Sequence, residues 1–568
     1  MSPAADPATV ADLLDQRASD DGVGLLRGDE RWSWAEVVER STEVAAWLGE
    51  HRPPGPFHVG VLLDNTPEYL FLLFGAALAG ATVVGVNPTR RGAELARDIR
   101  HTDCGIVVVS PDHLPLLDGL DLGDALVVTV DAGWRPPHPA AAGRLGNAAG
   151  GSAGPAGPGA AGGPASAGTG SGPTAEDLFV LIFTSGSTGA PKAVRMTQGR
   201  AVRMAVATTW LGRDDVLYSA MPLFHGNALN AIVLPALGSG ATIALRDRFS
   251  ASAFMDDVRR HGATFFSTVG RALSYVLATP ESPHDKEHRV KFALAPESSP
   301  TDVRAFRRRF GIPCFGGYGS SENAIIMSPV PGMPREALGV PPDETDAAVV
   351  DPETFEEKPR ARFAEDGRLL NAAEAIGELV GRNVVDRFEG YYANPEADAE
   401  RTRNGWYWSG DLAYRDDQGV FFFAGRVGEW LRVDSENFAA APVERILGRY
   451  PPVRAAAVYA VPDERTADDQ VMVAFELADG AAFDPAGFAE FLDAQTDLGT
   501  KWAPRYVRIT TLPVGATNKV DKRPLRTERW STDDPVFWRP GRQGPYRPFT
   551  RSDRDELEAR FREHGRHR

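Results

Sequence analysis

Cysteine is scarce in this sequence. Cys104 and Cys314 are the two thiols among 568 residues. They are not spaced as a Cys-x-x-Cys pair, and two cysteines cannot build a disulfide framework. This excludes a small disulfide-stabilised secreted fold and favours a reducing, cytoplasmic location, in which we expect both thiols to be small buried apolar groups.

Positive charge is also in deficit. The chain has 61 Lys and Arg against 77 Asp and Glu, which gives a net charge of -16. Such a balance argues against a protein whose task is to neutralise nucleic-acid phosphates. It does not exclude a small anionic ligand, because local loops and metal ions set the field at a site.

A long uninterrupted hydrophobic run is lacking too. Residues 70–86 have about the length of a membrane span, but Gly75, Gly80 and Gly85 interrupt them. We expect a buried helix and a buried strand there, and no transmembrane segment. Residues 1–17 carry acids where a secretory signal has a basic start and an apolar run, so we expect no such signal.

What is present is ordinary for a large soluble enzyme, with 43% hydrophobic and 24% charged residues. Apolar runs and turn residues near the start predict alternating strands and helices. The expected order is a strand at 59–63, a helix at 67–79 ending at Gly80, a strand at 81–86, a helix at 92–101 and a strand at 105–109. Units of this length predict an α/β fold with a parallel sheet covered by helices.

The composition changes sharply at residues 136–173, which are mostly Ala, Gly, Pro and Ser. We interpret this segment as a flexible insert without chemistry. After about Gly425 the pattern predicts a smaller unit, with a strand at 430–433, a helix near Pro442 and strands at 455–460 and 470–475. Residues 553–568 are expected to form a charged surface helix.

A loop rich in glycine and hydroxyl groups follows the apolar run at 178–183. It reads Thr184-Ser185-Gly186-Ser187-Thr188-Gly189-Ala190-Pro191-Lys192. Glycines let the backbone approach a ligand closely, and hydroxyls and free N–H groups can surround phosphate oxygens. The loop lacks the Gly-Lys-Ser/Thr ending of the common nucleotide-binding loop. It predicts a phosphate-binding site of a different kind.

Four further motifs follow in the chain. They are Tyr318-Gly319-Ser320-Ser321-Glu322, Trp408-Ser409-Gly410-Asp411, Gly425-Arg426-Val427-Gly428-Glu429 and Thr517-Asn518-Lys519. A carboxylate such as Glu322 suits a magnesium ion that bridges phosphates. One carboxylate such as Asp411 can accept hydrogen bonds from both hydroxyls of a ribose. Taken singly, Glu322 and Lys519 would be interpreted as solvated surface charges.

In this order the five motifs resemble the signatures of the adenylate-forming (AMP-binding) superfamily, which includes acyl-CoA ligases, peptide-synthetase adenylation domains and luciferases. Asn65-Thr66-Pro67-Glu68 and Ser267-Thr268-Val269-Gly270-Arg271 look like the branch of fatty-acid transport proteins and very-long-chain acyl-CoA synthetases. The resemblance implies a large N-terminal domain of mixed sheets covered by helices, residues 1–427. It also implies a smaller mobile α+β lid, residues 428–568, that carries the catalytic lysine and rotates about Gly428.

By resemblance, the cofactors are ATP and Mg²⁺, with Glu322 as the metal ligand. The implied catalytic residues are Lys519, Glu322, Thr184 and His225, of which His225 lies beside the acid pocket. The implied nucleotide-binding residues are Thr184, Ser185, Gly186, Ser187, Thr188, Gly189, Lys192, Tyr318, Gly319, Ser320, Ser321, Asp411 and Arg426. Candidates for the wall of the acid pocket are Thr268, Val269, Gly270, Ala295 and Gly317.

The implied reaction joins AMP to an acid, releases pyrophosphate and passes the activated group to an acceptor. A fatty or aryl carboxylic acid with CoA as acceptor is the leading hypothesis. Ser435, where CoA ligases usually have glycine, could narrow the pantetheine channel or merely line it. The alternatives are a diazotase of secondary metabolism that adenylates nitrite for an aromatic amine, a luciferase-like oxidation, and a non-catalytic nucleotide- or lipid-binding protein. The sequence identifies neither the acid nor the oligomeric state.

Overall fold

The computed structural model describes residues 6–563, apart from short gaps and one long one. The gaps are 138–171, 185–191, 297, 299, 331, 335–336, 366–368, 428–429, 434–435, 465–468, 496–497, 500, 515–519 and 542–543. The chain divides into two compact units. Unit 1 is Met1–Ser185, Pro191–Ser267 and Glu287–Val290, and unit 2 is Gly186–Ala190, Thr268–Lys286 and Lys291–Arg568.

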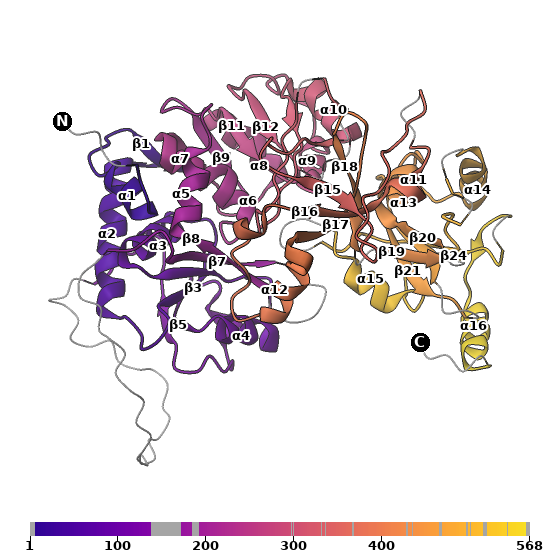
Figure 1. Cartoon of the computed structure of the whole chain (residues 1–568), viewed down its shortest axis with the longest axis horizontal. Coiled ribbons are helices and arrows are strands. Elements are labelled where there is room, and N and C mark those ends of the chain that lie inside the picture. The colour runs from indigo at the N-terminus through magenta and orange to yellow at the C-terminus, as the bar shows by residue number, and fades with distance from the viewer. Residues whose placement is uncertain are drawn as a thin grey trace, which may run out of the picture. The chain divides into compact units, whose positions relative to one another are not determined.

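Unit 1 contains a largely parallel sheet whose strands lie in the order β6-β5-β3-β4-β7-β8. The strands are β3 (His58–Leu62), β4 (Thr82–Gly85), β5 (Cys104–Val109), β6 (Leu126–Thr129), β7 (Leu178–Thr184) and β8 (Lys192–Thr197). Only β8 is antiparallel to its neighbour in this group. The sheet belongs to the indigo-to-purple part of the ribbon (Figure 1).

Helix α3 (Pro67–Ala79) follows β3 and is buried from Pro67 to Ala77. Pro67 begins it, because a helix start needs no N–H there. Gly80 ends it in the left-handed conformation, with φ of 67°. Helix α4 (Gly92–His101) then leads to β5. The predicted strand–helix order, and the buried helix and strand at 70–86, are therefore confirmed.

Five further strands of unit 1 lie side by side in the order β11-β9-β10-β1-β2 and belong to a seven-stranded sheet. These strands are β1 (Val23–Arg27), β2 (Glu30–Ser33), β9 (Val216–Ser219), β10 (Thr242–Leu245) and β11 (Phe265–Ser267). The remaining helices of unit 1 are α1 (Val10–Asp15), α2 (Trp34–Glu50), α5 (Gln198–Val206), α6 (Gly226–Ala228), α7 (Leu234–Ser239) and α8 (Ala251–Arg260).

Unit 2 contains an antiparallel sheet in the order β14-β18-β17-β16-β15. The strands are β14 (Ala337–Gly339), β15 (Ala347–Val350), β16 (Gly377–Gly381), β17 (Tyr407–Arg415) and β18 (Phe421–Arg426). Helices α9 (Gly270–Leu277), α10 (Pro300–Phe310) and α12 (Pro395–Arg401) belong to the same unit, as does the parallel pair β12 (Phe292–Leu294) and β13 (Cys314–Phe315). One face of the antiparallel sheet packs against the segment that contains Ala324, Ile325 and Met327.

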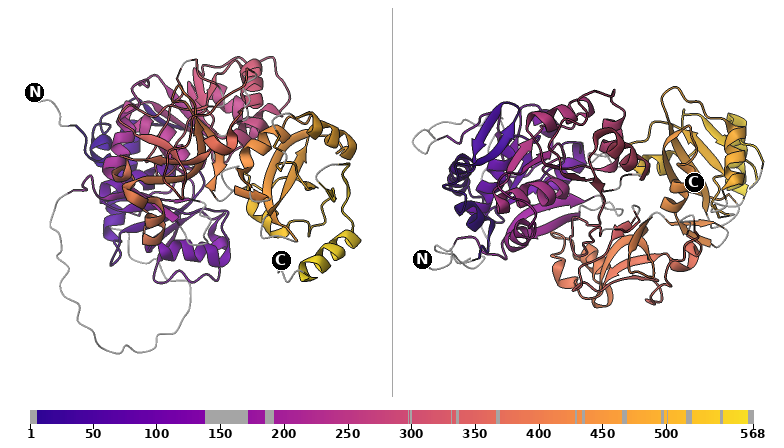
Figure 2. Two further views of the ribbon diagram at one scale, coloured as in Figure 1. Left: turned by 45° about the vertical axis from the view of Figure 1, so that its right-hand side comes forward. Right: turned by 90° about the horizontal axis from the view of Figure 1, so that it is seen from above.

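The end of unit 2 has its own sheet, β21-β22-β23-β24-β25, and the hairpin β19 (Trp430–Val433) and β20 (Glu436–Ala439). The sheet strands are β21 (Val453–Pro462), β22 (Asp469–Leu477), β23 (Tyr506–Ile509), β24 (Val536–Trp538) and β25 (Arg547–Pro548), and the helices are α13 (Ala440–Leu447), α14 (Pro485–Ala494), α15 (Lys522–Glu528) and α16 (Arg551–Glu563). The ribbon of these elements runs from orange to yellow in Figure 2.

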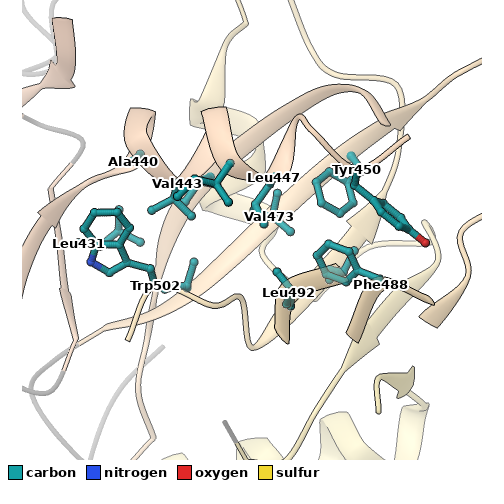
Figure 3. Close-up of a cluster of buried hydrophobic side chains, with 14 of the residues drawn as sticks. Leu431, Ala440, Val443, Leu447, Tyr450, Val473, Phe488, Leu492 and Trp502 are labelled. Atoms are coloured by element: carbon teal, nitrogen blue, oxygen red, sulfur yellow. The ribbon is translucent and has the colours of Figure 1, made fainter. Parts of the chain in front are cut away.

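This terminal part has a hydrophobic core of its own. Val443 and Leu447 of α13 pack with Val473 of β22, and the rings of Tyr450 and Phe488 lie 5.2 Å apart (Figure 3). A separate core supports the predicted α+β character of this part. The boundary at residue 427 stays a prediction, because the division into units 1 and 2 falls elsewhere.

The fold shows how far the two cysteines are buried and how long and apolar each described helix is. Cys104 is buried and Cys314 is partly buried. Burial raises the pKa of each thiol to about 12, so both stay protonated at neutral pH. In the part of the chain that the structure describes, every helix is too short or too polar to cross a membrane.

Candidate active site

Asp411 and Arg426 face one another across the ladder between β17 and β18. They are register partners in this antiparallel pair, and Nε of Arg426 lies 2.9 Å from Oδ1 of Asp411. The hydroxyl of Ser409 fixes the strand, because it donates to the carbonyl of Leu379 on β16 at 2.7 Å and accepts the N–H of Asp411 at 3.0 Å. The sheet therefore sets the position of this carboxylate.

The Asp411 carboxylate also binds the first residue of the Tyr318 motif. The phenol of Tyr318 donates to Oδ2 at 2.5 Å. The backbone of Tyr318 is itself held, because it exchanges two hydrogen bonds with Met327, at 3.1 and 2.9 Å. Two motifs predicted to bind one nucleotide therefore meet inside unit 2.

Glu322 lies in a tight turn directly after this tyrosine. The N–H of Asn323 binds the carbonyl of Ser320 at 3.1 Å, and Asn323 has a φ of 55°. Asparagine tolerates this left-handed conformation better than most residues. The turn directs the Glu322 side chain inward, where it is 6% exposed.

Tyr391 donates a hydrogen bond of 2.6 Å to Oε1 of Glu322. Burial alone raises the pKa of this carboxyl, but the charge of Arg401 and the bond from Tyr391 outweigh burial, and the pKa lies below its ordinary value. Glu322 is therefore ionised at neutral pH. Among the described residues, no three His, Cys, Asp or Glu side chains gather as a metal site. A single ionised carboxylate suits Mg²⁺ that is held mainly by phosphates.

For the Asp411 carboxyl, the effect of burial on the pKa outweighs the effects of the neighbouring groups. It is 2% exposed, and burial raises its pKa above the ordinary value although Arg426 and Tyr318 oppose that effect. Its Oδ1 atom is fully buried and, within the described residues, receives no hydrogen bond of good geometry. Arg426 lies 2.9 Å from this atom and compensates its charge, but the oxygen keeps lone pairs for hydrogen-bond donors. It therefore fits an incoming hydroxyl donor such as a ribose.

Arg426 differs from its partner in exposure. Its side chain is 50% exposed, whereas that of Asp411 is 2% exposed. Asp411 lies on β17, which β16 and β18 flank, whereas Arg426 lies at the end of β18. The guanidinium thus neutralises the carboxylate from the solvent side.

In unit 1, Thr184 and Lys192 close the base of the glycine-rich loop. They are the last register partners of the antiparallel pair β7 and β8, and the Thr184 hydroxyl donates to the Lys192 carbonyl at 3.4 Å. Lys192 is buried, with 6% exposure. The loop residues Ser185, Gly186, Ser187, Thr188 and Gly189 lie outside the described residues, as do Gly428, Ser435 and Lys519.

His225 is the N-cap residue of helix α6, and its ring lies 5.2 Å from that of Phe224. The helix continues as a π-helical turn, Leu229–Val233, a distortion that is frequent at functional sites. Asn227 and Asn230 have buried amide oxygens without a hydrogen-bond partner in the part of the chain that is described. Two buried polar atoms therefore follow the histidine, and both could accept hydrogen bonds from a ligand.

Three of the candidates for the pocket wall, Thr268, Gly270 and Ala295, lie on neighbouring segments of unit 2. The N–H groups of Thr268 and Gly270 bind the carbonyls of Leu294 and Pro296, at 2.9 and 3.0 Å. The N–H of Ala295 in turn binds the carbonyl of Phe315 at 2.8 Å. Thr268 and Ala295 are almost fully buried.

Tyr391 and Arg401 belong to the site, although the sequence motifs assigned no role to either of them. Arg401 is the last residue of α12, and its Nε donates to the Tyr391 hydroxyl at 3.1 Å. Glu322 and Tyr391 are 69 positions apart. The Gly390-Tyr391-Tyr392 segment upstream of Asp411 is recognisable in the sequence, but it does not predict which side chains Tyr391 contacts.

The geometry can be compared with known proteins. The model of a family described as AMP-binding enzyme matches residues 12–392. Steroid-22-oyl-CoA synthetase from Rhodococcus jostii (strain RHA1) is 50% identical over 568 residues, covering 99% of this chain and 98% of that protein. Medium/long-chain-fatty-acid–CoA ligase FadD17 from Mycobacterium marinum is 42% identical, covering 94% and 98%. ATP-bound MatB from Rhodopseudomonas palustris has a similar fold, with a TM-score of 0.74, 24% identity and coverage of 91% and 98%.

Proposed function

This chain belongs to the AMP-binding enzyme family, and from that premise we propose that its substrate is a steroid acid activated at carbon 22. The reaction class follows from the close relatives. The chain is an AMP-forming ligase that activates an acid as its AMP anhydride and passes the acyl group to CoA. The resemblance seen in the motifs is confirmed at this level.

The choice of a steroid acid depends on one observation. The relative named for steroid-22-oyl-CoA synthesis is 50% identical over 99% of the chain, whereas the ligase named for medium- and long-chain fatty acids is 42% identical over 94%. Both kinds of acid are apolar and carry one carboxyl group. A medium- or long-chain fatty acid is therefore the second candidate.

In the first half-reaction, an oxygen of the substrate carboxylate attacks the α-phosphorus of ATP, and the bond to pyrophosphate breaks. Catalysis of this kind depends mainly on positioning and on stabilising charge. We assign the ribose hydroxyls to Asp411 and the Mg²⁺ that accompanies ATP to Glu322. The ion, when bound, neutralises charge on the phosphates. Lys519 is assigned to the α-phosphate and the attacking acid, and the Thr184 loop to the remaining phosphates.

In the second half-reaction, the sulfur of CoA attacks the acyl carbonyl carbon and AMP leaves. Residues 428–568 are the proposed lid, and rotation about Gly428 withdraws Lys519 and admits CoA. Glycine suits a hinge because it tolerates large backbone changes. Ser435 lies in the part of the lid that we assign to the pantetheine channel. We place the reaction in the cytoplasm, where free thiols such as CoA persist.

The experiment is a mass-spectrometric assay of purified protein with ATP and Mg²⁺. Each of four acids is offered with CoA and without it: a steroid with a C22 carboxyl, decanoate, benzoate and nitrite. Nitrite is also offered with an aminobenzoate. We expect AMP and a steroid-22-oyl-CoA thioester, with kcat/KM at least about 10-fold above that for decanoate, since burying more apolar surface is worth this much.

A higher kcat/KM for decanoate would replace the steroid acid by the fatty acid. A diazo product from nitrite without any thioester would instead revive the diazotase hypothesis, which the relatives named above do not favour. Undetectable pyrophosphate release with every acid would indicate a non-catalytic binding protein. An oxygen-dependent product would indicate luciferase-like oxidation.

A further inference from the structure

Tyr391 and Arg401 link the Glu322 carboxylate to the strand that carries Asp411. From Glu322, the chain of contacts runs to the hydroxyl of Tyr391 at 2.6 Å and on to Nε of Arg401 at 3.1 Å. The hydroxyl donates to the carboxylate and accepts from the guanidinium, so each proton has an acceptor. A charge-assisted bond of this kind is stronger than a neutral one.

The other end of the same guanidinium contacts the strand that carries Asp411. Nη1 of Arg401 donates to the carbonyl of Trp408 at 3.1 Å. Gly410 has a φ of 72°, and a Cβ atom there would lie 2.2 Å from Nη1. The guanidinium therefore fills the space that this glycine leaves open, directly beside Asp411.

The segment between these two residues is fixed by short-range bonds. The carboxylate of Asp398 accepts the N–H of Tyr391 at 2.7 Å, and the Asn394 side chain caps α12 by accepting the N–H of Ala397 at 3.2 Å. The side chains of Tyr391 and Arg401 are thereby held on one rigid turn of chain. Each has few conformations to lose when it holds a partner.

We propose that Tyr391 and Arg401 are positioning residues. Tyr391 orients Glu322 toward the metal-bound phosphates, and Arg401 fixes the position of Glu322 relative to the Gly410-Asp411 turn. This inference rests on the proposed function of the site. The distance between a carboxylate that serves the phosphates and one that serves the ribose must match the nucleotide. One planar guanidinium with donors at both ends can fix that distance.

The test measures binding as well as turnover, with Tyr391→Phe, Arg401→Gln and Arg401→Lys. Calorimetry gives the affinities for ATP with Mg²⁺, for ATP with EDTA and for AMP. Pyrophosphate release gives kcat and KM. Tyr392→Phe and Arg382→Gln are the matched controls, since Tyr392 is the adjacent tyrosine and Arg382 pairs with Glu357 at 2.8 Å and Asp346 at 3.7 Å.

For Tyr391→Phe we expect about 10-fold weaker binding of ATP with Mg²⁺, the effect of losing one charge-assisted bond. AMP affinity and ATP affinity in EDTA should stay within about 2-fold of wild type. For Arg401→Gln we expect the affinities for both ATP with Mg²⁺ and AMP to fall by about 10-fold or more. Arg401→Lys should lie between wild type and Arg401→Gln, because it keeps the charge and loses the planar fork.

Wild-type affinities and kcat in both Tyr391→Phe and Arg401→Gln would overturn the proposal, as would equal losses for every ligand in Tyr391→Phe. A fully wild-type Arg401→Lys would overturn the two-ended role of the guanidinium. If Arg401→Gln does not fold, Tyr391→Phe alone decides the outcome. Failure of the proposed function appears separately, as wild-type protein that binds nucleotide but releases no acid-dependent pyrophosphate.

Discussion

The phenol of Tyr318 donates a 2.5 Å hydrogen bond to the carboxylate of Asp411, across 93 positions of the chain. The two residues belong to motifs that were predicted separately from the sequence. The ring of a tyrosine at this position can contact the base of a nucleotide while its hydroxyl binds the carboxylate that we assign to the ribose. Nucleotide binding at this site should therefore depend on both side chains together.

Replacing Asp411 by Asn should weaken the binding of both ATP and AMP. The loss should be about 1.5–3 kcal/mol, the range for hydrogen bonds to a charged group, or about 10- to 100-fold in Kd. Calorimetric titration measures it. Asp417→Asn, at an exposed position of the β17–β18 turn, is the control and should bind like wild type. Equal Kd values for all three proteins would contradict the ribose role of Asp411.

The stability of Asp411→Asn and Glu322→Gln should respond to pH in opposite ways. The pKa of Asp411 is raised above 3.8, so its contribution to folding is present at low pH and is lost as pH rises through the raised value. The pKa of Glu322 is lowered from 4.5, so its contribution is present above that value and is lost as pH falls through the lowered one.

Urea unfolding between about pH 2.5 and pH 8 measures this difference, since the Glu322 contribution changes only below pH 4.5. Asp411→Asn should gain stability relative to wild type as pH rises. Glu322→Gln should be less stable than wild type at neutral pH, with a gap that narrows under acid conditions. Parallel curves for the two variants would rule out the opposite pKa shifts.

Gly410→Ala should destabilise the protein more than Gly419→Ala. Both glycines have positive φ, 72° and 81°, so both substitutions carry about 1–2 kcal/mol of backbone strain. Nothing lies within 4 Å of a Cβ at Gly419, whereas a Cβ at Gly410 meets the Arg401 guanidinium. Thermal unfolding gives the difference, and AMP affinity should fall only for Gly410→Ala. Similar melting temperatures would show that Arg401 moves aside freely.

Lys519→Ala should lower acid-dependent pyrophosphate release by about 10²–10³-fold, the usual loss when one charge-stabilising donor is removed. ATP affinity should change far less, because Glu322, Asp411 and the glycine-rich loop remain. Arg523→Ala, which removes an exposed charge four residues on, is the control and should keep full activity. Full activity in Lys519→Ala would remove this lysine from the mechanism.

Much of the fold was predictable because particular residues begin and end the elements. Pro67 and Gly80 bound α3, and α4 has the predicted limits. The antiparallel direction of β8 beside β7 was not predicted, since an apolar run has the same pattern in either direction.

The candidate site also has a part that the sequence predicted and a part that it did not. Glu322 and Asp411 were predicted because five motifs together resemble the family's signatures, whereas Glu322 taken singly would be interpreted as a surface charge. The contacts of Arg401 with Tyr391 and Trp408 depend on how α12 packs against β17, and a sequence pattern does not encode such an approach. The functional roles assigned to Lys519 and to residues 185–189 stay predictions.

The unequal exposure of Asp411 and Arg426 has a consequence for how a nucleotide enters. Because half of the Arg426 side chain is exposed, water can replace its contact with Asp411 on the arginine side, whereas the buried carboxylate needs new donors once the guanidinium leaves. We expect the ribose hydroxyls to supply those donors, so that Arg426 can leave the carboxylate and contact the phosphate of the same nucleotide. Nucleotide binding would thus exchange the ion pair between Asp411 and Arg426 for contacts of each residue with the ligand.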